Sequence, residues 1–419
     1  MMKPIDVAIV GAGNRGGEAY ARYALENPHD VSIVAVAESD PARRSRLSDA
    51  HAIPDGARFE DWQTLFDRRK LADAVLICTG DREHYRPALR AIELGYHVML
   101  EKPMAVEPSE CLEIASAAEK AGVTLTIAHV LRYSPMFRTV KLLLDTGEIG
   151  RIVAIQHNEN VGYWHFAHSY VRGNWRRTET SSPIILAKSC HDMDLLYWFA
   201  GARCSAVGSF GSLVHFRSEN APEGHTARCL DGCPHLYTCP FSAMRIYGET
   251  PAGQWPRSVV TAEHSREALF EALRTGPYGR CVYECDNDVT DNQAVAMSFE
   301  NGVSATFTLS AFTHDVSRTI KIMGNAGEMR IHLERNEIEI HRFSDRSVHR
   351  VEPQVPTGGH GGGDEGLMRS FVEAVRSGNG GAVFSARESA EGHLMAFAAE
   401  KARLTGEIVR MDRFVSEAE

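Results

Sequence analysis

The sequence lacks a long hydrophobic run, because no segment approaches the ~20 apolar residues that a membrane-spanning helix needs. Its first residues, MMKPIDVAIVGAG, enter a strand-like segment at once, without the apolar stretch and cleavage site of a secretory signal. It also lacks an excess of positive charge: the formal net charge is −10, and no block of lysine or arginine occurs. We therefore expect a cytoplasmic protein that binds neither membranes nor nucleic acids.

Cysteine gives no sign of a disulfide framework, because the nine residues are an odd number and a reducing compartment is expected. The stretch CLDGCPHLYTCP spaces Cys229, Cys233 and Cys239 as C-x3-C-x5-C, and further ligands are available at His225, Cys281 and Cys285. This spacing matches no standard zinc finger. We therefore expect reduced cysteines in an inserted loop and no metal, with a structural zinc as the alternative.

The first part of the chain alternates apolar strand-like segments with helical ones. At 419 residues the chain is too long for one ordinary core, so two domains are expected. The pattern predicts strands at 5–10, 31–38, 73–80, 96–103 and 123–130, with helices at 17–26, 84–94 and 107–121. This order is typical of a doubly wound parallel sheet, so we expect an α/β Rossmann domain over residues 1–130.

Residues 131–419 follow a different pattern, which predicts an α+β domain. Apolar and polar residues alternate at 303–310, 328–333 and 337–343, as in antiparallel strands with one covered face. Two helical segments, 364–377 and 385–405, follow a glycine cluster. We expect this domain to bind substrate, and its final helices are candidates to pack back on the Rossmann domain.

A glycine-rich loop follows the first predicted strand. Gly11, Gly13 and Gly16 form G-x-G-x-x-G between a strand and a helix, as the dinucleotide-binding fingerprint requires. Gly11 permits the tight turn, and Gly13 lets the backbone approach a pyrophosphate at the positive end of the helix. We expect these glycines, with Asn14 and Arg15 between them, to bind the cofactor; a glycine-rich turn without a ligand is the alternative.

The end of the second predicted strand bears on the choice of cofactor. Glu38 stands where an acid would bind both ribose hydroxyls, and its charge would repel a 2′-phosphate. Arg43 and Ser39 could instead accommodate that phosphate. We therefore expect NAD, and NADP is not excluded.

The motif Glu101-Lys102-Pro103 lies at the carboxyl end of a predicted parallel strand, where open α/β sheets bind ligands. Lys102 could hydrogen-bond an alcohol oxygen and stabilise the negative charge that develops as the proton leaves. From chemistry alone, a surface Lys102 paired with Glu101 is an equal alternative.

The chain resembles the glucose–fructose oxidoreductase / inositol dehydrogenase / MocA (Gfo/Idh/MocA) family in the segments GAGNRGG, DAVLICTGDREHY, GYHVMLEKPMAV and LRYSPMFRTVKLLLDTGEIGRI. The resemblance implies a large, mostly antiparallel open sheet in the C-terminal domain, and a homo-oligomer. It implies NAD(P)-dependent hydride transfer to or from a hydroxyl or keto carbon of a sugar, cyclitol or related carbohydrate. It places Thr79, Gly80 and His84 along the cofactor, Glu101 near the nicotinamide ribose, and Lys102 in the active site.

The stretch IILAKSCHDMDL matches an H-x-x-D helix that faces the nicotinamide in this family. The resemblance implies that His191 exchanges the substrate proton while Lys102 holds the same oxygen. The alternative is a buried histidine satisfied by Asp194 or a backbone group. We expect Asp194 to orient local structure rather than to do chemistry.

The chain departs from inositol-dehydrogenase-like relatives one turn before the histidine, where their aspartate is replaced by Ala187. Lys188 stands three residues before His191, on the adjoining face of the expected helix. It could lower the imidazole pKa, bind a substrate carboxylate or hydroxyl, or point to solvent.

Two further segments contribute candidate substrate contacts. In YVRGNWRR, Trp175 offers a flat face for a sugar ring and Arg176 offers hydrogen-bond donors. In GGHGGGDEG, His360 and Asp364 flank glycines that could let them reach the cleft, although Asp364 could equally be an N-cap. Two other functions stay open: an NAD-dependent glycosidase that oxidises the sugar transiently, and a non-catalytic NAD-binding protein.

Overall fold

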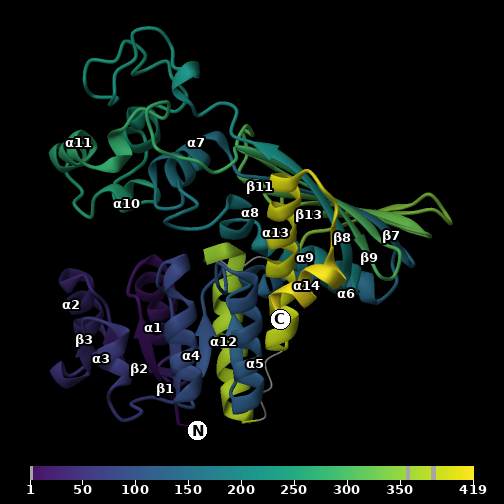
Figure 1. Cartoon of the computed structure of the whole chain (residues 1–419), viewed down its shortest axis with the longest axis horizontal. Coiled ribbons are helices and arrows are strands. Elements are labelled where there is room, and N and C mark those ends of the chain that lie inside the picture. Colours follow the sequence, from purple (N-terminus) through teal and green to yellow (C-terminus); the bar gives the residue numbers. More distant parts are fainter. Residues whose placement is uncertain (1–2, 355–358, 379–383) are drawn as a thin grey trace.

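A computed structural model describes residues 3–354, 359–378 and 384–419 of the chain (Figure 1). Within these residues the chain forms one six-stranded sheet and one nine-stranded sheet. The first is parallel and the second is mostly antiparallel, which confirms the expected fold class. No helix of the described residues is long and apolar enough to cross a membrane.

The parallel sheet has the strand order β3-β2-β1-β4-β5-β6, which reverses direction at β1 as in a doubly wound fold. In chain order its strands are β1 (Ile5–Val10), β2 (Val31–Ala37), β3 (Arg58–Phe59), β4 (Ala74–Ile77), β5 (His97–Leu100) and β6 (Leu125–Ile127). Its helices are α1 (Ala21–Glu26), α2 (Pro41–Ala50), α3 (Trp62–Phe66), α4 (Tyr85–Glu93) and α5 (Pro108–Ala121). Every residue of β4 is buried, because helices cover both faces.

The first helix differs from its prediction. Residues Asn14–Tyr20 form a π-helical turn, and α1 follows only at Ala21. The backbone is crowded there, since a Cβ on Gly16 would lie 2.1 Å from the Gly11 carbonyl oxygen. Because Gly16 has no Cβ, the π-helical turn can pack directly against the glycine-rich loop that precedes it.

The nine-stranded sheet has the order β14-β13-β12-β11-β7-β10-β9-β8-β15, and β7 and β10 are its parallel pair. Its strands are β7 (Ile152–Asn160), β8 (Cys204–Ser212), β9 (Asn292–Phe299), β10 (Ser304–Ser310), β11 (Ser317–Gly324), β12 (Gly327–His332), β13 (Glu337–Arg342), β14 (Val348–Val351) and β15 (Val409–Arg410). The pattern predicted β10, β12 and β13. In β9 and β10 buried and exposed residues alternate, so one face packs on helices and the other is open.

The remaining helices are α6 (Pro135–Asp145), α7 (Tyr163–Phe166), α8 (Ile184–Ala187), α9 (Cys190–Ala200), α10 (Arg257–Val260), α11 (Arg266–Thr275), α12 (Gly363–Ser377), α13 (Ala386–Thr405) and α14 (Met411–Ala418). Helix α13 packs on α5 of the first domain and on α9 and β8 of the second. Figure 1 shows α13 running from α5 toward the nine-stranded sheet, whereas α12 packs on β1 and on residues Val130–Tyr133. Ala386 and Ala390 of α13 belong to the core of the parallel sheet.

The segment between β8 and β9 is an insertion that extends away from the sheet (Figure 1). Its first part, residues 213–243, consists of turns and one short 3-10 helix, and α10 and α11 follow. It packs against residues Ala167–Arg172, which precede the helix that carries His191.

Candidate active site

The three glycines of the glycine-rich loop have different surroundings. Gly11 has φ +90°, and a Cβ there would lie 2.7 Å from the Cys78 carbonyl oxygen. Gly16 is equally crowded, whereas a Cβ on Gly13 would meet nothing within 4 Å. Gly11 and Gly16 therefore hold the turn, and Gly13 faces open space. This arrangement fits a dinucleotide whose pyrophosphate approaches the backbone at Gly13.

The carboxylate of Glu38 lies against this loop at the end of β2. Its Oε2 accepts a hydrogen bond from the Ala12 amide at 2.6 Å, and its Oε1 accepts one from the Asp40 amide at 2.9 Å. The Ser39 hydroxyl is 3.4 Å from the same Oε1, whereas the side chain of Arg43 is exposed on α2. The acid that would bind ribose hydroxyls is thus fixed, which fits NAD.

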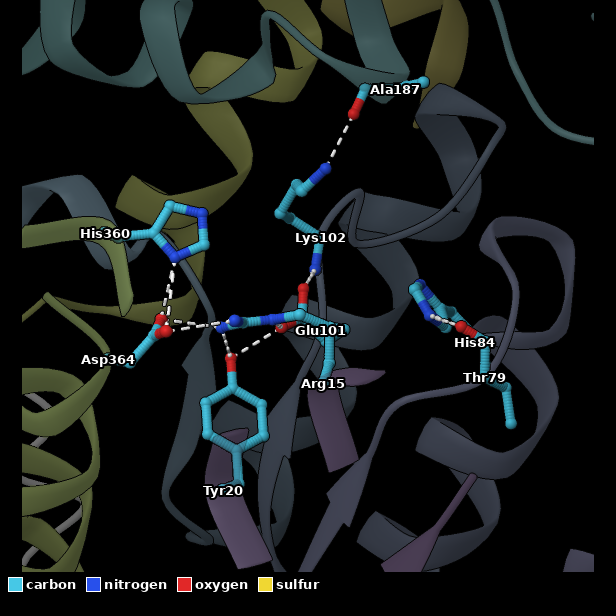
Figure 2. A network of polar contacts seen from close by, with 9 residues as sticks. All are labelled: Arg15, Tyr20, Thr79, His84, Glu101, Lys102, Ala187, His360 and Asp364. Atoms are coloured by element: carbon cyan, nitrogen blue, oxygen red, sulfur yellow. Dashed lines mark hydrogen bonds and ion pairs between the residues drawn. The ribbon is translucent and has the colours of Figure 1, made fainter. Parts of the chain in front are cut away.

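Arg15 joins three elements instead of facing open space (Figure 2). Its Nε donates to Glu101 Oε1 at 2.7 Å, and its Nη2 donates to Asp364 Oδ1 at 2.8 Å and to the Tyr20 hydroxyl at 2.6 Å. Burial alone would raise the pKa of Glu101, but the charges of Arg15 and Lys102 hold that pKa below its usual value. The loop, the strand end after β5 and helix α12 are therefore tied together by charge.

Lys102 reaches from the first domain to the second. Its Nζ donates to the Ala187 carbonyl oxygen at 2.7 Å, and of the groups of Lys102 only the backbone amide donates to Glu101. The alternative of a surface lysine whose ammonium pairs with Glu101 is therefore wrong. Figure 2 shows the lysine extended toward Ala187, away from the Arg15 cluster.

His84 supports the turn that carries Lys102. It is buried, with Nδ1 2.7 Å from the Pro103 carbonyl oxygen and Nε2 3.1 Å from the Thr79 carbonyl oxygen. The Thr79 hydroxyl donates to the Glu83 carbonyl at 2.9 Å, and Gly80 is exposed beside it. His84 thus links the turn after β5 to the turn after β4, where Thr79 and Gly80 lie.

His191 lies near the start of α9 and is 7% exposed. Among the described residues its buried Nδ1 has no hydrogen-bond partner. Burial, followed by the charges of Lys102 and His129, lowers the pKa of His191 well below its usual value. The ring is therefore neutral at pH 7 and able to accept a proton.

Asp194 does not satisfy this histidine. Its two carboxylate oxygens accept hydrogen bonds from Arg132 Nε at 2.7 Å and Arg132 Nη2 at 2.6 Å. The alternative in which Asp194 partners His191 is therefore wrong, and Asp194 anchors α9 to the segment after β6.

Lys188 does not share a helix face with His191, because α8 ends at Ala187 and α9 begins at Cys190. Its Nζ lies 3.2 Å from Glu159 Oε1, and Arg318 Nη2 lies 2.7 Å from Glu159 Oε2. The expected i,i+3 relationship fails because the backbone leaves the helix at Lys188 and Ser189. The largest cationic influence on the His191 pKa comes instead from Lys102.

A charged network that the sequence did not reveal lies beneath Lys188. Arg318 Nε donates to Asp192 Oδ1 at 2.7 Å, and His157 Nε2 lies 2.8 Å from the same oxygen. Burial opposes the ionisation of Asp192, but Arg318 and His157 outweigh it and hold its pKa below the usual value. The network fixes α9 on β7 and β11; the polar residues within β7 were its only sequence signal.

Asp81 is a second residue that the sequence analysis missed. Its Oδ1 accepts from Trp175 Nε1 at 3.2 Å, and its Oδ2 accepts from the hydroxyls of Ser181 at 2.8 Å and Ser182 at 3.0 Å. Trp175 is 37% exposed, so part of its side chain remains accessible. Arg176 instead pairs with Asp286 of the insertion at 2.9 Å. The position of Asp81 directly after Thr79-Gly80 was the available signal.

His360 and Asp364 both lie near the start of α12. The His360 ring centroid is 6.4 Å from that of His191, and its Nδ1 lies 3.0 Å from Asp364 Oδ1. Gly362 is the N-cap of α12, so the alternative of Asp364 as N-cap is wrong. His360 has φ +50°, a left-handed conformation that few non-glycine residues adopt, and the Asp364 contact helps to hold it.

The assembled site places a lysine, a neutral histidine and a second histidine beside the end of a dinucleotide-binding sheet. Such groups can hold a hydroxyl oxygen and accept its proton. Among the described residues no group of three His, Cys, Asp or Glu side chains is arranged to hold a metal ion.

Comparisons with known proteins agree with this geometry. The profile "Oxidoreductase family, NAD-binding Rossmann fold" (GFO_IDH_MocA) matches residues 5–129, and "Oxidoreductase family, C-terminal alpha/beta domain" matches residues 141–409. The Bacillus subtilis protein "Putative oxidoreductase YteT" is 22% identical over 394 residues, covering 87% of this chain and 88% of that protein.

More distant or shorter matches name specific enzymes. The D-glucoside 3-dehydrogenase of Escherichia coli is 32% identical, over only 36% of this chain and 41% of that protein. A solved levoglucosan dehydrogenase, in complex with NADH and L-sorbose, superposes with a TM-score of 0.73 at 18% identity, covering 98% of this chain and 99% of that one. At that identity the superposition establishes the shared fold.

Proposed function

Because the chain belongs to the Gfo/Idh/MocA oxidoreductase family, we propose that it transfers a hydride between NAD and a hydroxyl or keto carbon of a sugar, cyclitol or related carbohydrate. The observation that carries this proposal is the buried, unpartnered Nδ1 of His191 in the same site as Lys102. Bound NAD would supply the hydride acceptor. The names of the similar enzymes, a glucoside dehydrogenase and a levoglucosan dehydrogenase, support the carbohydrate class.

The cofactor would lie along Gly11, Gly13, Asn14, Gly16, Glu38, Thr79 and Gly80. Arg15 and His84 support this surface through Glu101 and Pro103 rather than by facing it. The fixed carboxylate of Glu38 favours NAD over NADP, because a 2′-phosphate would meet its charge. Binding constants for the two dinucleotides test this; equal or tighter NADP binding would assign the outcome to Ser39 and Arg43.

His191 and Lys102 act on the same hydroxyl in this proposal. The neutral imidazole takes the hydroxyl proton, and the ammonium donates a hydrogen bond to the oxygen as its negative charge develops. The ammonium is already oriented by Ala187, so a substrate oxygen would share or replace that carbonyl. We propose that three side chains contact the substrate: Trp175, Lys188 and His360. Arg176 and Asp364 support this surface indirectly, through ion pairs with Asp286 and Arg15 respectively.

The decisive experiment is a panel of sugars, cyclitols and sugar acids followed by NADH absorbance and by product release. A dehydrogenase accumulates NADH with a keto product. Release of a free sugar without net NADH would indicate the glycosidase, and NAD binding without turnover on any substrate would indicate a binding protein. The similar enzymes named above are dehydrogenases, so we favour the first outcome.

We further propose a cytoplasmic homo-oligomer that pairs through the open face of the nine-stranded sheet, and a domain boundary near residue 130. Small residues are exposed there on β9 and β10: Ala294, Ala296, Thr306 and Thr308. Light scattering on the wild-type chain and on Ala296→Glu tests the assembly. A monomeric wild type would contradict it.

A further inference from the structure

A group of cysteines lies in the insertion, outside the active site. Cys229, Cys233, Cys239 and Cys281 line one cavity of about 20 Å³. All four are free thiols. The surrounding segment, residues 213–243, has little regular structure and few buried apolar side chains to hold it (Figure 1). Small, loop-rich regions of this kind usually need a cross-link or a metal.

Two histidines line the same cavity but are engaged elsewhere. His225 Nε2 lies 2.8 Å from Glu284 Oε1, and His235 Nε2 lies 2.9 Å from the Glu223 carbonyl oxygen. Cys285 does not line the cavity, and its thiol donates to the Cys281 carbonyl at 3.2 Å. Of the metal-binding side chains that line the cavity, the four thiols are therefore the ones not engaged elsewhere.

Arg172 gives a second, independent indication. It is 1% exposed, and its Nε and Nη2 donate to the carbonyl oxygens of Arg280 at 2.7 Å and Phe241 at 2.8 Å. Its Nη2 is also 3.8 Å from Cys229 Sγ. In the part of the chain that the structure describes, Arg172 Nη1 has no hydrogen-bond partner, and no carboxylate lines the cavity beside this guanidinium.

A buried cation without a counterion is strongly unfavourable, so a negative charge is required nearby. No carboxylate lines the cavity beside Arg172, so the thiols are the lining groups that can most readily carry that charge. Thiols bound to a metal are deprotonated, and four thiolates around a divalent ion carry a net charge of about −2.

We propose that Cys229, Cys233, Cys239 and Cys281 bind one structural zinc ion. Four sulfur ligands select zinc or an iron–sulfur cluster, and a cavity with room for about one water-sized sphere fits a single ion. In the described structure the four thiols are not arranged as a ligand set, so the proposal requires their side chains to change conformation when the ion binds. The metal then supplies the negative charge beside Arg172 and cross-links the two ends of the insertion.

The consequence for the enzyme is indirect. Arg172 ends the segment Ala167–Arg172, three residues before Trp175. Zinc binding at the cysteines would therefore hold Arg172 in place, and with it the segment that leads to Trp175. The zinc takes no part in the chemistry.

Metal analysis of the full chain, purified without chelator, tests the proposal. We expect about one zinc per chain in the wild type and in the matched control Cys285→Ser, and less than a tenth of that in Cys239→Ser. A folded wild type that contains no zinc and takes up none when zinc is added overturns the proposal. So does a Cys239→Ser variant with the zinc content of the wild type.

A measurement on the wild type decides the matter if Cys239→Ser does not fold. Thiols are counted with a disulfide reagent before and after removal of metal by a strong chelator. We expect about four thiols to become reactive after the chelator, and cobalt substitution to give a thiolate-to-metal charge-transfer band. Unchanged thiol reactivity and no such band would refute the site.

Discussion

The ammonium of Lys102 lies 2.7 Å from the carbonyl oxygen of Ala187. The acceptor ends α8, in the domain opposite the lysine. A backbone carbonyl cannot be protonated and adds no charge, so Lys102 is oriented without being neutralised. Its full positive charge stays available to lower the pKa of His191 and to stabilise an alkoxide.

Replacing Lys102 by methionine should lower turnover by roughly 10²–10⁴, the scale expected when a charge that stabilises the transition state is removed. The dissociation constant of NAD should change little, because the glycine loop and Glu38 lie on other strand ends. Steady-state kinetics and calorimetric NAD titration measure both quantities. The exposed α5 residue Lys120, changed to methionine, is the control; wild-type kcat in Lys102→Met contradicts the role.

His191→Ala should cause a loss of the same order, roughly 10²–10⁴ in kcat, with NAD affinity preserved. Because burial and Lys102 lower the pKa of His191, the acid limb of the wild-type pH–rate profile should fall well below pH 6.5. In Lys102→Met, the acid limb of the residual activity should lie at a higher pH, because a charge that lowers the His191 pKa has been removed. Near wild-type turnover of His191→Ala at every pH would make the histidine structural and leave Lys102 or His360 as the base.

Two glycines of one loop should respond in opposite ways to alanine. Gly13→Ala should leave the melting temperature nearly unchanged, because its Cβ meets no atom, but should weaken NAD binding at the pyrophosphate. Gly16→Ala should lower the melting temperature, because its Cβ would lie 2.1 Å from a carbonyl oxygen. Thermal unfolding with and without NAD separates the two. Unchanged NAD affinity in Gly13→Ala would remove this loop from the site.

Lys188→Ala should raise KM and leave the kinetic pKa in place. The lysine is partly exposed and paired with Glu159, and Arg318 still neutralises Glu159 when the lysine is lost. Lys102, not Lys188, dominates the cationic influence on His191. A shift of the kinetic pKa with unchanged KM would instead show that Lys188 tunes the histidine.

Acid should destabilise the fold below about pH 6.5 through buried neutral histidines. Burial lowers the pKa of His168 to about 4 and that of His393 to about 3, from an ordinary value of 6.5. The unfolded chain therefore binds more protons below pH 6.5, so stability is full above that pH and falls as the pH drops. Each histidine should account for about 2 kcal/mol at pH 5.

Urea unfolding at pH 7.5 and pH 5 measures this loss. The exposed residue His314, changed to glutamine, should retain the wild-type pH dependence. A free energy of unfolding that is equal at the two pH values would contradict the assignment.

Local sequence patterns were sufficient for the parts of the molecule that depend on near neighbours. The buried strands of the first sheet and the turn at Gly11 follow from apolar runs and from glycine's access to positive φ. Strands such as β7 were missed because their covered face holds His157 and Glu159, which read as polar until Asp192 and Arg318 are placed beside them.

The roles of individual site residues depended on contacts that no local pattern contains. Arg15 was expected at the cofactor, yet it pairs with Asp364, 349 residues away along the chain. Lys188 was assigned to a helix face that a break between α8 and α9 removes. Asp81 acquires its partners only when the loop containing Trp175 folds over it. Motif spacing predicted the type of reaction, whereas tertiary contacts determine which of the predicted side chains are free to take part in it.

The packing of α13 means that the core of the first domain is completed only late in synthesis. Ala386 and Ala390 complete the core of the first sheet, whose last strand ends at Ile127. At roughly 5–20 residues per second, a ribosome needs about 15–50 s to bridge that interval. During this delay the nascent first domain exposes an apolar patch to which chaperones can bind. A ribosome-stalled chain ending near residue 300 should therefore be cut by protease within its first domain, at a concentration that leaves the finished protein intact.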